Sequence, residues 1–276
     1  MTATQTPPPA AGLEPAAART VAPTQSRWWP LLSLATLTVV FVVWWLLTSV
    51  TGTIPALYFP APEEVASAAN RLGLTLLTDS AATIGRVLVS WLLGGGLGIF
   101  VGLVMVRSRF LYFLLSPVIE ALRPVPPVAL IPFVILWFGV GNDGKIFLGA
   151  LACFMVMAVN TIVSSQNLPP VYVRAARSLG ASERQVYRTV VFPGIMPELV
   201  SGARIAAALA FAVVVAAEFL GAESGIGRLI MLASRTLNTP VVLLGTIMIG
   251  LQAFILERVI RAVSTRITRW AERSTD

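Results

Sequence analysis

The amino-acid sequence predicts an all-α polytopic membrane protein with six transmembrane helices and both termini in the cytoplasm. Of the 276 residues, 56% are hydrophobic and only 12% are charged, whereas a soluble domain carries about 25% charged residues. The apolar runs approach the ~20 residues that a helix needs to cross a bilayer. The basic residues gather in alternate segments between these runs, which is the pattern of a chain that crosses a membrane repeatedly.

The N-terminal part of the chain divides into a polar tail and a first span. Residues 1–26 are rich in Ala, Pro and Thr and lack an apolar face, so we expect a disordered cytoplasmic tail there. The first span is expected at about 30–50. Pro62, followed by two glutamates, predicts the start of a short amphipathic helix that extends to about Leu77.

Five further spans complete a membrane domain over about 27–262. The second, at about 82–106, carries glycines spaced by four, which let another helix approach closely. The third, at about 110–140, is interrupted by four prolines. The remaining spans are expected at about 146–165, 197–220 and 240–259, and a basic cytoplasmic tail is expected at 263–276. The spaced glycines are Gly94, Gly98 and Gly102, and the interrupting prolines are Pro124, Pro126, Pro127 and Pro132.

The distribution of basic residues gives the orientation. If the N-terminus is inside, thirteen basic residues fall on inner segments and four on outer ones, which agrees with the excess of Lys and Arg in cytoplasmic loops. The same orientation puts the polar segment 171–193 in the cytoplasm. It also accounts for the net charge of +7 without a nucleic-acid partner, which would require the charge to cluster on one water-facing surface.

The polar segment 171–193 predicts two short helices joined by a tight turn. The first helix is expected over 171–179, with Gly180 in the left-handed position that follows a helix end. Ser182, with a glutamine three residues later, has the pattern of a capping box and begins the second helix, which Pro193 is expected to end. The arginines then face the cytoplasm, where they could enforce topology, bind anionic lipid headgroups or dock a partner. An apolar side of the second helix must rest on the bundle, and it is formed by Val186, Val190 and Val191.

The spacing within this segment resembles a cytoplasmic loop in the permease subunits of bacterial ABC importers. That loop reads Glu-Ala-Ala, three residues, Gly, nine residues, a branched apolar residue, one residue, Leu-Pro. Two positions depart from the pattern, because Arg174 stands where the family often has Glu and Phe192 where Leu is usual. The residues that keep the spacing are Ala175, Ala176, Gly180, Val190 and Pro193.

The resemblance extends over about residues 28–270. The segments PAPEEV at 60–65, RPVPPVALIPFVILWFGVGNDGKI at 123–146 and AEFLGAESGIGRLI at 217–230 resemble the sulfonate, taurine and nitrate branch of these permeases. The segment at 123–146 looks most like that of taurine permeases. The resemblance implies the type I importer permease fold.

The resemblance also implies partners and a function. A homodimer in the bacterial cytoplasmic membrane is expected to bind two ATPase subunits and an external substrate-binding protein. ATP and Mg²⁺ belong to the ATPase subunits, so this chain is expected to hold no cofactor and not to be an enzyme. The expected solute is a small anionic or zwitterionic compound such as taurine or another sulfonate, moved by alternating access; nitrate, bicarbonate and a pyrimidine precursor remain alternatives. The expected ATPase-coupling residues are Arg174, Ala175, Ala176, Arg177, Gly180, Ser182, Glu183, Arg184, Val190 and Pro193.

Several residues in or near the spans are candidates for the transport site. Glu120 and Arg123 lie three apart and can pair on one helix face, and charges inside a membrane are costly enough to indicate function. Prolines in the interrupted segment leave backbone groups without their helical hydrogen bonds. Within a membrane such groups are tolerated only where they are buried in protein or line a water-filled path. The candidates for the pathway or gate are therefore Glu120, Arg123, Pro124, Pro126, Pro127, Pro132 and Glu218, and those for contact with the binding protein are Glu223 and Arg228.

Three other interpretations are disfavoured. Gly139–Lys145 fits the pattern of a phosphate-binding loop, but Ile146 stands where the magnesium-binding Ser or Thr belongs, so we interpret it as a turn between the third and fourth spans. A secondary transporter driven by an ion gradient generally has more spans, an internal repeat and intramembrane acids on an ion path, whereas this sequence shows no convincing repeat and has too few buried acids. A membrane enzyme needs polar side chains that converge on one site. The chain has no histidine that could act as a general base, so neither a catalytic nor a metal site is expected.

Overall fold

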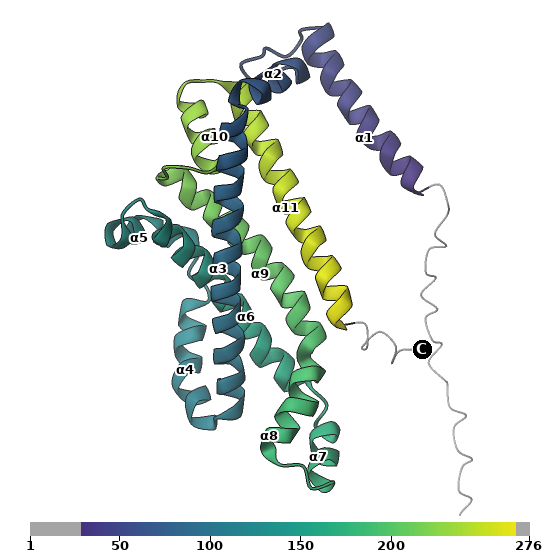
Figure 1. The fold of residues 1–276 in the computed structure, drawn as a ribbon, viewed down its shortest axis with the longest axis vertical. Helices are drawn as coiled ribbons and strands as arrows, with labels where there is room; N and C mark the ends of the chain where they lie inside the picture. The colour runs from purple at the N-terminus through teal and green to yellow at the C-terminus, as the bar shows by residue number, and fades with distance from the viewer. Residues whose placement is uncertain (1–28, 269–276) are drawn as a thin grey trace, which may run out of the picture. The chain divides into compact units, whose positions relative to one another are not determined.

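A computed structural model of the chain describes residues 29–268, and all regular secondary structure within that range is helical (Figure 1). Within that range, ten α-helices have eight or more residues, and only α8 is shorter. Short 3₁₀ and π-helical turns (η) lie between some of them. In chain order the elements are α1 (Trp29–Trp45), η1 (Leu46–Val50), α2 (Pro62–Leu72), α3 (Leu74–Arg107), α4 (Arg109–Leu122), η2 (Pro127–Leu130), α5 (Ile131–Phe138), α6 (Asn142–Asn167), α7 (Pro170–Ser178), α8 (Glu183–Val186), η3 (Tyr187–Val191), α9 (Phe192–Leu220), α10 (Ile226–Arg235) and α11 (Thr239–Thr268).

By length and composition, five helical segments can cross a membrane, or six if α4 and the η2–α5 segment form one broken span bent by 83°. The six expected spans correspond to these six segments. The first of them, Leu31–Val50, contains no charged residue and ends in the π-helical η1.

The helices are longer than the expected spans, and two of their ends differ from the predictions. The amphipathic helix α2 ends at Leu72 rather than near Leu77, because Gly73 has a φ of +48° and separates it from α3. The expected N-terminal tail (1–26) lies outside the described residues, as does the end of the expected C-terminal tail from 269 onward. Residues 263–268 are helical and complete α11.

The prediction that Pro193 ends the second helix of the polar segment is wrong. The helical segment continues from Glu183 to Leu220 through α8, η3 and α9. In the π-helical η3 the N–H of Phe192 donates to the carbonyl of Tyr187, five residues back. This wider turn directly before the proline accommodates a ring that cannot donate a hydrogen bond and that would collide with a regular α-helical carbonyl.

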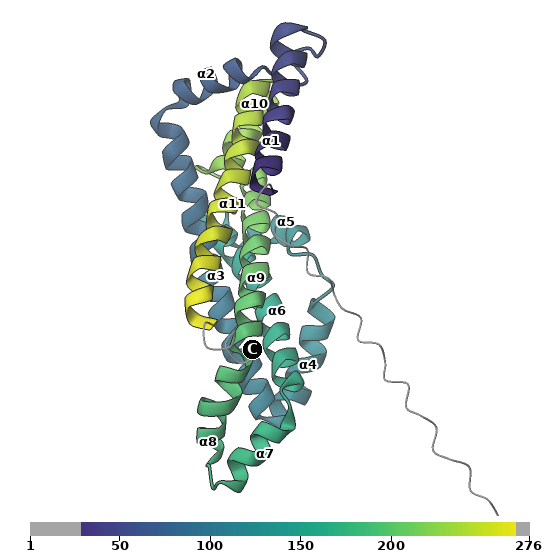
Figure 2. The ribbon, with the colours of Figure 1, turned by 90° about the vertical axis from the view of Figure 1, so that its right-hand side faces the viewer.

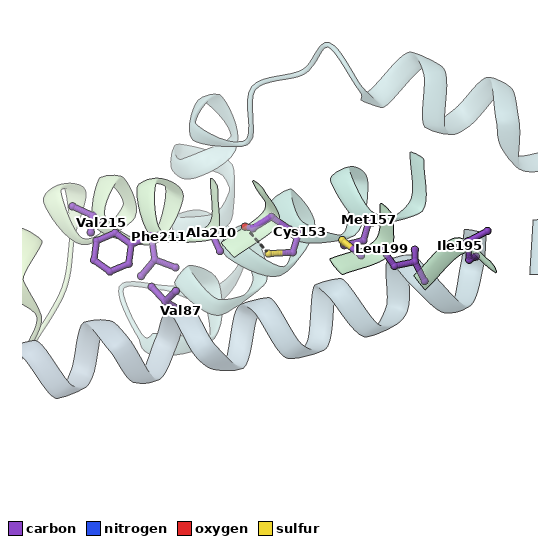
Figure 3. Close-up of a cluster of buried hydrophobic side chains, with 10 residues drawn as sticks. Val87, Cys153, Met157, Ile195, Leu199, Ala210, Phe211 and Val215 are labelled. Carbon is purple, nitrogen blue, oxygen red and sulfur yellow. Dashed lines mark hydrogen bonds between the residues drawn. The ribbon is translucent and has the colours of Figure 1, made fainter. Parts of the chain in front are cut away.

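The core lies where α3, α6 and α9 pack side by side. Figure 3 shows a cluster of buried side chains in which Val87 of α3 meets Phe211 of α9, and Met157 of α6 lies beside Leu199 of α9. Cys153 belongs to the same cluster, and its thiol donates to the carbonyl of Ala206 at 3.3 Å. The cysteine therefore packs in the core.

The expected close approach along the spaced glycines is confirmed. A Cβ atom at Gly94 would lie 2.0 Å from the carbonyl oxygen of Ala150 on α6, and one at Gly98 would lie 2.7 Å from that of Phe154. One at Gly102 would lie 2.6 Å from Cβ of Thr161. Hydrogen in place of a side chain at these positions thus lets the backbones of α3 and α6 touch, as small residues do between membrane helices.

Gly94→Ala is expected to destabilise the folded chain by about 1–3 kcal/mol, because the added methyl group meets a backbone carbonyl that can move only if the two helices separate. Gly96→Ala is the matched control, since it lies two residues away on the same helix with nothing within 4 Å of its Cβ position. The measurement is the free energy of unfolding in detergent micelles. Equal stability of the two variants would show that this close approach is not needed.

Candidate functional site

The turn between α7 and α8 has the geometry that its sequence predicts. Gly180 has a φ of +82°, in the left-handed region. Its N–H donates to the carbonyl of Arg177 at 2.9 Å, and the N–H of Ala181 donates to that of Ala176 at 3.1 Å. These two bonds form a Schellman motif, which satisfies the last carbonyls of α7. The turn is thus closed by its own backbone and requires a residue that adopts a positive φ.

The second helix of the segment begins with the predicted capping box. The N–H of Ser182 donates to Oε1 of Gln185 at 2.8 Å, and the N–H of Gln185 donates to Oγ of Ser182 at 3.4 Å. Val186 and Val191 are buried and Val190 is half-buried. This confirms the apolar side of the helix, which holds the segment against the rest of the bundle.

An ion pair that the sequence did not predict crosses the turn. Nε of Arg177 lies 2.9 Å from Oε1 of Glu183, and its Nη2 donates to the other carboxylate oxygen at 3.1 Å. Both side chains are about half exposed, so the pair adds at most about 1 kcal/mol to stability. Its effect is geometric, because a two-pronged contact fixes the angle between α7 and α8. Arg177 and Glu183, both candidate coupling residues, therefore bind each other.

The remaining candidate coupling residues lie on or beside this turn. Arg174, Ala175, Ser182 and Arg184 are exposed, Ala176 is half-buried, and Pro193 lies half-buried in the first turn of α9. Figures 1 and 2, which differ by a quarter turn, both place α7 and α8 together at one end of the bundle, beyond the ends of α4 and α11. The segment therefore forms a compact projection with its polar residues outward.

The proline-broken third span is a sharp bend with an exposed face. Pro124, Pro126 and Pro132 are exposed and Pro127 is half-buried. In the described range no ion pair joins Glu120 to Arg123; instead, Oγ of Ser116 donates to Glu120 at 2.9 Å. Both charged residues line a cavity of about 150 Å³ between α4 and α6. Glu120 and Arg123 thus lie together beside a small polar cavity without pairing.

Glu218, the pathway or gate candidate at the outer end of α9, is fully buried. Only 1% of its surface is exposed, and its carboxylate forms an ion pair with Arg86 of α3, which is 5% exposed. Thr83 donates its hydroxyl to the same carboxylate at 3.0 Å, and the N–H of Gly227 donates to it at 2.9 Å. A buried charge held in this way has its full set of partners.

The same arginine binds two further parts of the chain, and its neighbours on α3 bind the second of them as well. Nε of Arg86 donates to Oδ1 of Asn142 at the start of α6, at 2.8 Å. Its Nη atoms donate to the carbonyl and the hydroxyl of Ser224, at 2.9 and 2.7 Å. The N–H of Gly225 donates to Asp79 at 2.8 Å and that of Ile226 to Thr83 at 3.0 Å. We call Asp79, Thr83, Arg86, Asn142, Glu218 and the backbone of 224–227 the outer brace.

The glycine of the ESGIG stretch makes room for this arrangement. Gly225 has a φ of +119°, and a Cβ atom there would lie 2.4 Å from the carboxyl carbon of Glu218. Backbone N–H groups at the start of α10 therefore face a carboxylate directly, where the helix dipole favours negative charge. Glu223 next to it is exposed and Arg228 is half-buried, so both candidate contacts for a binding protein lie on or near the surface beside the outer brace.

Lys145 of the GVGNDGK stretch is not available to hold a phosphate. Its Nζ donates to the carbonyls of Val140 and Gly141, the latter at 2.7 Å, and only 4% of the residue is exposed. The turn itself covers Gly139 to Gly141, and α6 begins at Asn142. The lysine thus binds the turn that precedes its own helix, which agrees with the interpretation of the stretch as a turn.

Sequence reasoning found Glu218 but missed its partners. Arg86 is a charged residue within an apolar span, and such a residue indicates a functional or paired site by default. Asp79 and Thr83 lie seven and three residues before it on α3, so they occupy successive turns on one side of the helix. This spacing was the available signal. It does not identify the partner, which lies 132 residues away along the chain.

Comparison with known proteins identifies the family. Residues 94–269 match the family described as "Binding-protein-dependent transport system inner membrane component". The chain is 37% identical over 257 residues to the taurine transport system permease protein TauC of Escherichia coli (strain K12), covering 88% of this chain and 93% of that protein. It is 35% identical over 209 residues to the putative aliphatic sulfonates transport permease protein SsuC of the same organism, covering 75% and 80%.

A solved structure supports the fold. A chain of the MetNI methionine ABC transporter in an inward-facing conformation matches with a TM-score of 0.57 at 23% identity, covering 70% of this chain and 98% of that chain. The likeness shows the arrangement of helices alone. Together with the family match and the membrane-spanning helices, it leads to one conclusion: the chain belongs to the binding-protein-dependent transport system inner membrane component family and is the permease subunit of an ABC importer.

Proposed function

We propose that this permease works as a homodimer in the bacterial cytoplasmic membrane and binds two ATPase subunits through the α7–α8 turn. The observation that supports the proposal is the projecting turn itself. A Schellman motif ends α7, a capping box begins α8, and buried valines pack the segment against the bundle. A rigid, exposed element of this kind transmits movement between two subunits. ATP and Mg²⁺ are then bound by the ATPase, and this chain supplies the path for the solute.

We propose a second copy because of the surfaces that one protomer presents. A cavity of about 750 Å³ between α9 and α11 is lined almost entirely by apolar side chains, which suits neither a sulfonate nor another charged solute. The polar cavity beside Glu120 and Arg123 is only about 150 Å³. The proline-broken face is exposed in a single protomer. A pathway formed between two such faces would bury the proline break and keep its free carbonyls beside the solute.

The solute class is proposed from the named relatives. TauC is named for taurine and SsuC for aliphatic sulfonates, so a small sulfonate is the proposed solute of this chain. Nitrate, bicarbonate and a pyrimidine precursor remain the alternatives for the same machinery. Delivery by an external binding protein would use the surface that contains Glu223 and Arg228 beside the outer brace.

Reconstitution tests this function directly. The permease, its co-expressed ATPase subunit and its binding protein are placed in liposomes, and ATP hydrolysis and solute uptake are measured with taurine, a longer alkanesulfonate and nitrate. We expect uptake of a sulfonate that requires all three proteins, and no hydrolysis by the permease alone. Uptake driven by an ion gradient without ATP, or hydrolysis by the purified permease free of partners, would contradict the proposal.

A further inference from the structure

Two arginines of α10 have no partner at the outer end of the bundle. Arg228 is half-buried and Arg235 is exposed. Within the described range 29–268, neither guanidinium forms an ion pair or donates a hydrogen bond. In Figures 1 and 2, α10 lies at the end of the bundle opposite to the α7–α8 turn. This is the outer side in the orientation that the basic residues indicate.

The helix dipole accounts for one of these arginines but not for the other. Arg235 is the last residue of α10, where the free carbonyls of a helix end stabilise a cation. Arg228 is the third residue of the same helix, where the free N–H groups make a positive charge unfavourable. The carboxylate near this helix start belongs to Glu218 and already binds Arg86. The position of Arg228 therefore indicates a site for an anion.

The two arginines line one cavity of about 230 Å³ beside the end of α9. They are seven residues apart and so project from the same side of α10, about 10 Å from each other along its axis. Arginine side chains are long enough to converge over this separation. Met231 and Leu232 lie between them in the chain, and Phe219 of α9 lines the cavity as well. The cavity thus combines two guanidinium groups with an apolar wall.

One acidic residue lines the cavity, and its charge is already bound. The carboxylate of Glu218 accepts hydrogen bonds from Thr83 and from the N–H of Gly227 and pairs with Arg86. Glu223, which is exposed, is not among the lining residues. The cavity therefore has an excess of positive charge and can attract a small anion from the surrounding water.

We propose that Arg228 and Arg235 form a binding site for the sulfonate group of the solute at the outer mouth of the permease. The inference rests on the proposed function and deepens it by naming the residues that bind the anion. A sulfonate is a compact anion whose oxygens can accept the paired N–H groups of a guanidinium, as carboxylates and phosphates do. The short carbon chain would then contact Phe219, Met231 and Leu232. The cavity, at about 230 Å³, is smaller than the roughly 300–1,000 Å³ pockets that bind drug-sized ligands, so it suits a solute of few atoms.

The test measures binding of labelled taurine to the permease–ATPase complex in nanodiscs without the binding protein. We expect R228Q/R235Q to weaken binding by about tenfold or more, because each glutamine keeps a polar side chain but removes the charge. R228K/R235K keeps the charge and should recover part of the affinity, since lysine lacks the two-pronged geometry. Methanesulfonate should compete with taurine, whereas ethanolamine, which has the amine but no sulfonate, should not.

Arg71→Gln is the matched control. Arg71 is an exposed arginine of α2, in an outer segment of the chain, and its removal should leave taurine binding unchanged. The association of the binding protein with each variant is measured in parallel, because an acidic group of that protein is the competing partner for the arginines.

Four results would overturn the inference. They are equal affinity of R228Q/R235Q and the unaltered complex for taurine, competition by ethanolamine as strong as that by methanesulfonate, an unaltered complex that transports taurine but binds none without the binding protein, and a double variant that loses only its association with the binding protein. If the unaltered complex takes up no sulfonate even with its binding protein, the proposed function itself fails, and the two failures are thereby distinguished.

Discussion

Arg86→Ala is expected to destabilise the folded permease by about 3–5 kcal/mol, because it leaves the buried carboxylate of Glu218 without its cationic partner. The alanine also removes the donors to Asn142 and Ser224, so the outer ends of α3 and α6 and the segment before α10 lose their common partner. The measurement is the free energy of unfolding in detergent micelles, compared with the amount of full-length protein in the membrane.

Two comparisons separate the outer brace from a general effect of removing an arginine. Arg71→Ala removes an exposed arginine of α2 and should change stability by no more than about 0.5 kcal/mol. Glu218→Ala should be costly by itself, and Arg86→Ala combined with Glu218→Ala should cost less than the two single changes added together, by about 0.5–3 kcal/mol. Strict additivity would mean that the ion pair makes no contribution in the membrane.

The outer brace restricts how the permease can move. Arg86 of α3 binds Asn142 of α6, Glu218 of α9 and Ser224 before α10. Separating these helix ends would break the buried ion pair and leave each charge without its partner, which is strongly unfavourable. Movement during transport is therefore expected elsewhere, such as at the 83° bend of the third span.

The parts of this molecule that were predictable from sequence are those controlled by neighbouring residues. The α7–α8 turn follows from Gly180, Ser182 and the glutamine at 185, all within a few positions of one another. The packing of α3 on α6 follows from the spaced glycines, because their missing side chains are visible in the sequence. Local rules of capping and close approach apply to both cases.

The features that escaped prediction depend on distant parts of the chain or on competing local rules. Arg86 and Glu218 are 132 residues apart, and no periodicity connects them. Pro193 looked like a helix end, because a proline usually interrupts the backbone bonds before it; the π-helical η3 absorbs that interruption instead. The prolines of the third span predicted a break, but its angle depends on how α4 packs on α3 and how α5 packs on α6.

Gly180→Pro is expected to weaken binding of the ATPase subunit by a hundredfold or more, if the turn is the docking element. Proline fixes φ near −65° and has no N–H, whereas Gly180 has a φ of +82° and donates to Arg177. The mismatch costs about 3 kcal/mol, which corresponds to roughly a hundredfold in affinity. Gly180→Asn is the matched control, because asparagine tolerates the left-handed region and keeps its N–H, so binding should be largely retained.

The position of Gly180 makes this comparison informative about function rather than folding. Nothing lies within 4 Å of the Cβ position at this glycine, so neither substitution collides with the bundle, and the buried valines of the second helix remain in place. Gly180→Asn should therefore unfold at nearly the same temperature as the unaltered permease. The strain of Gly180→Pro is confined to the exposed turn, so binding is compared at a temperature at which both variants are folded. If Gly180→Pro binds the ATPase subunit as tightly as Gly180→Asn does, the left-handed turn is not what the partner recognises, and the contact must be sought elsewhere on the cytoplasmic surface.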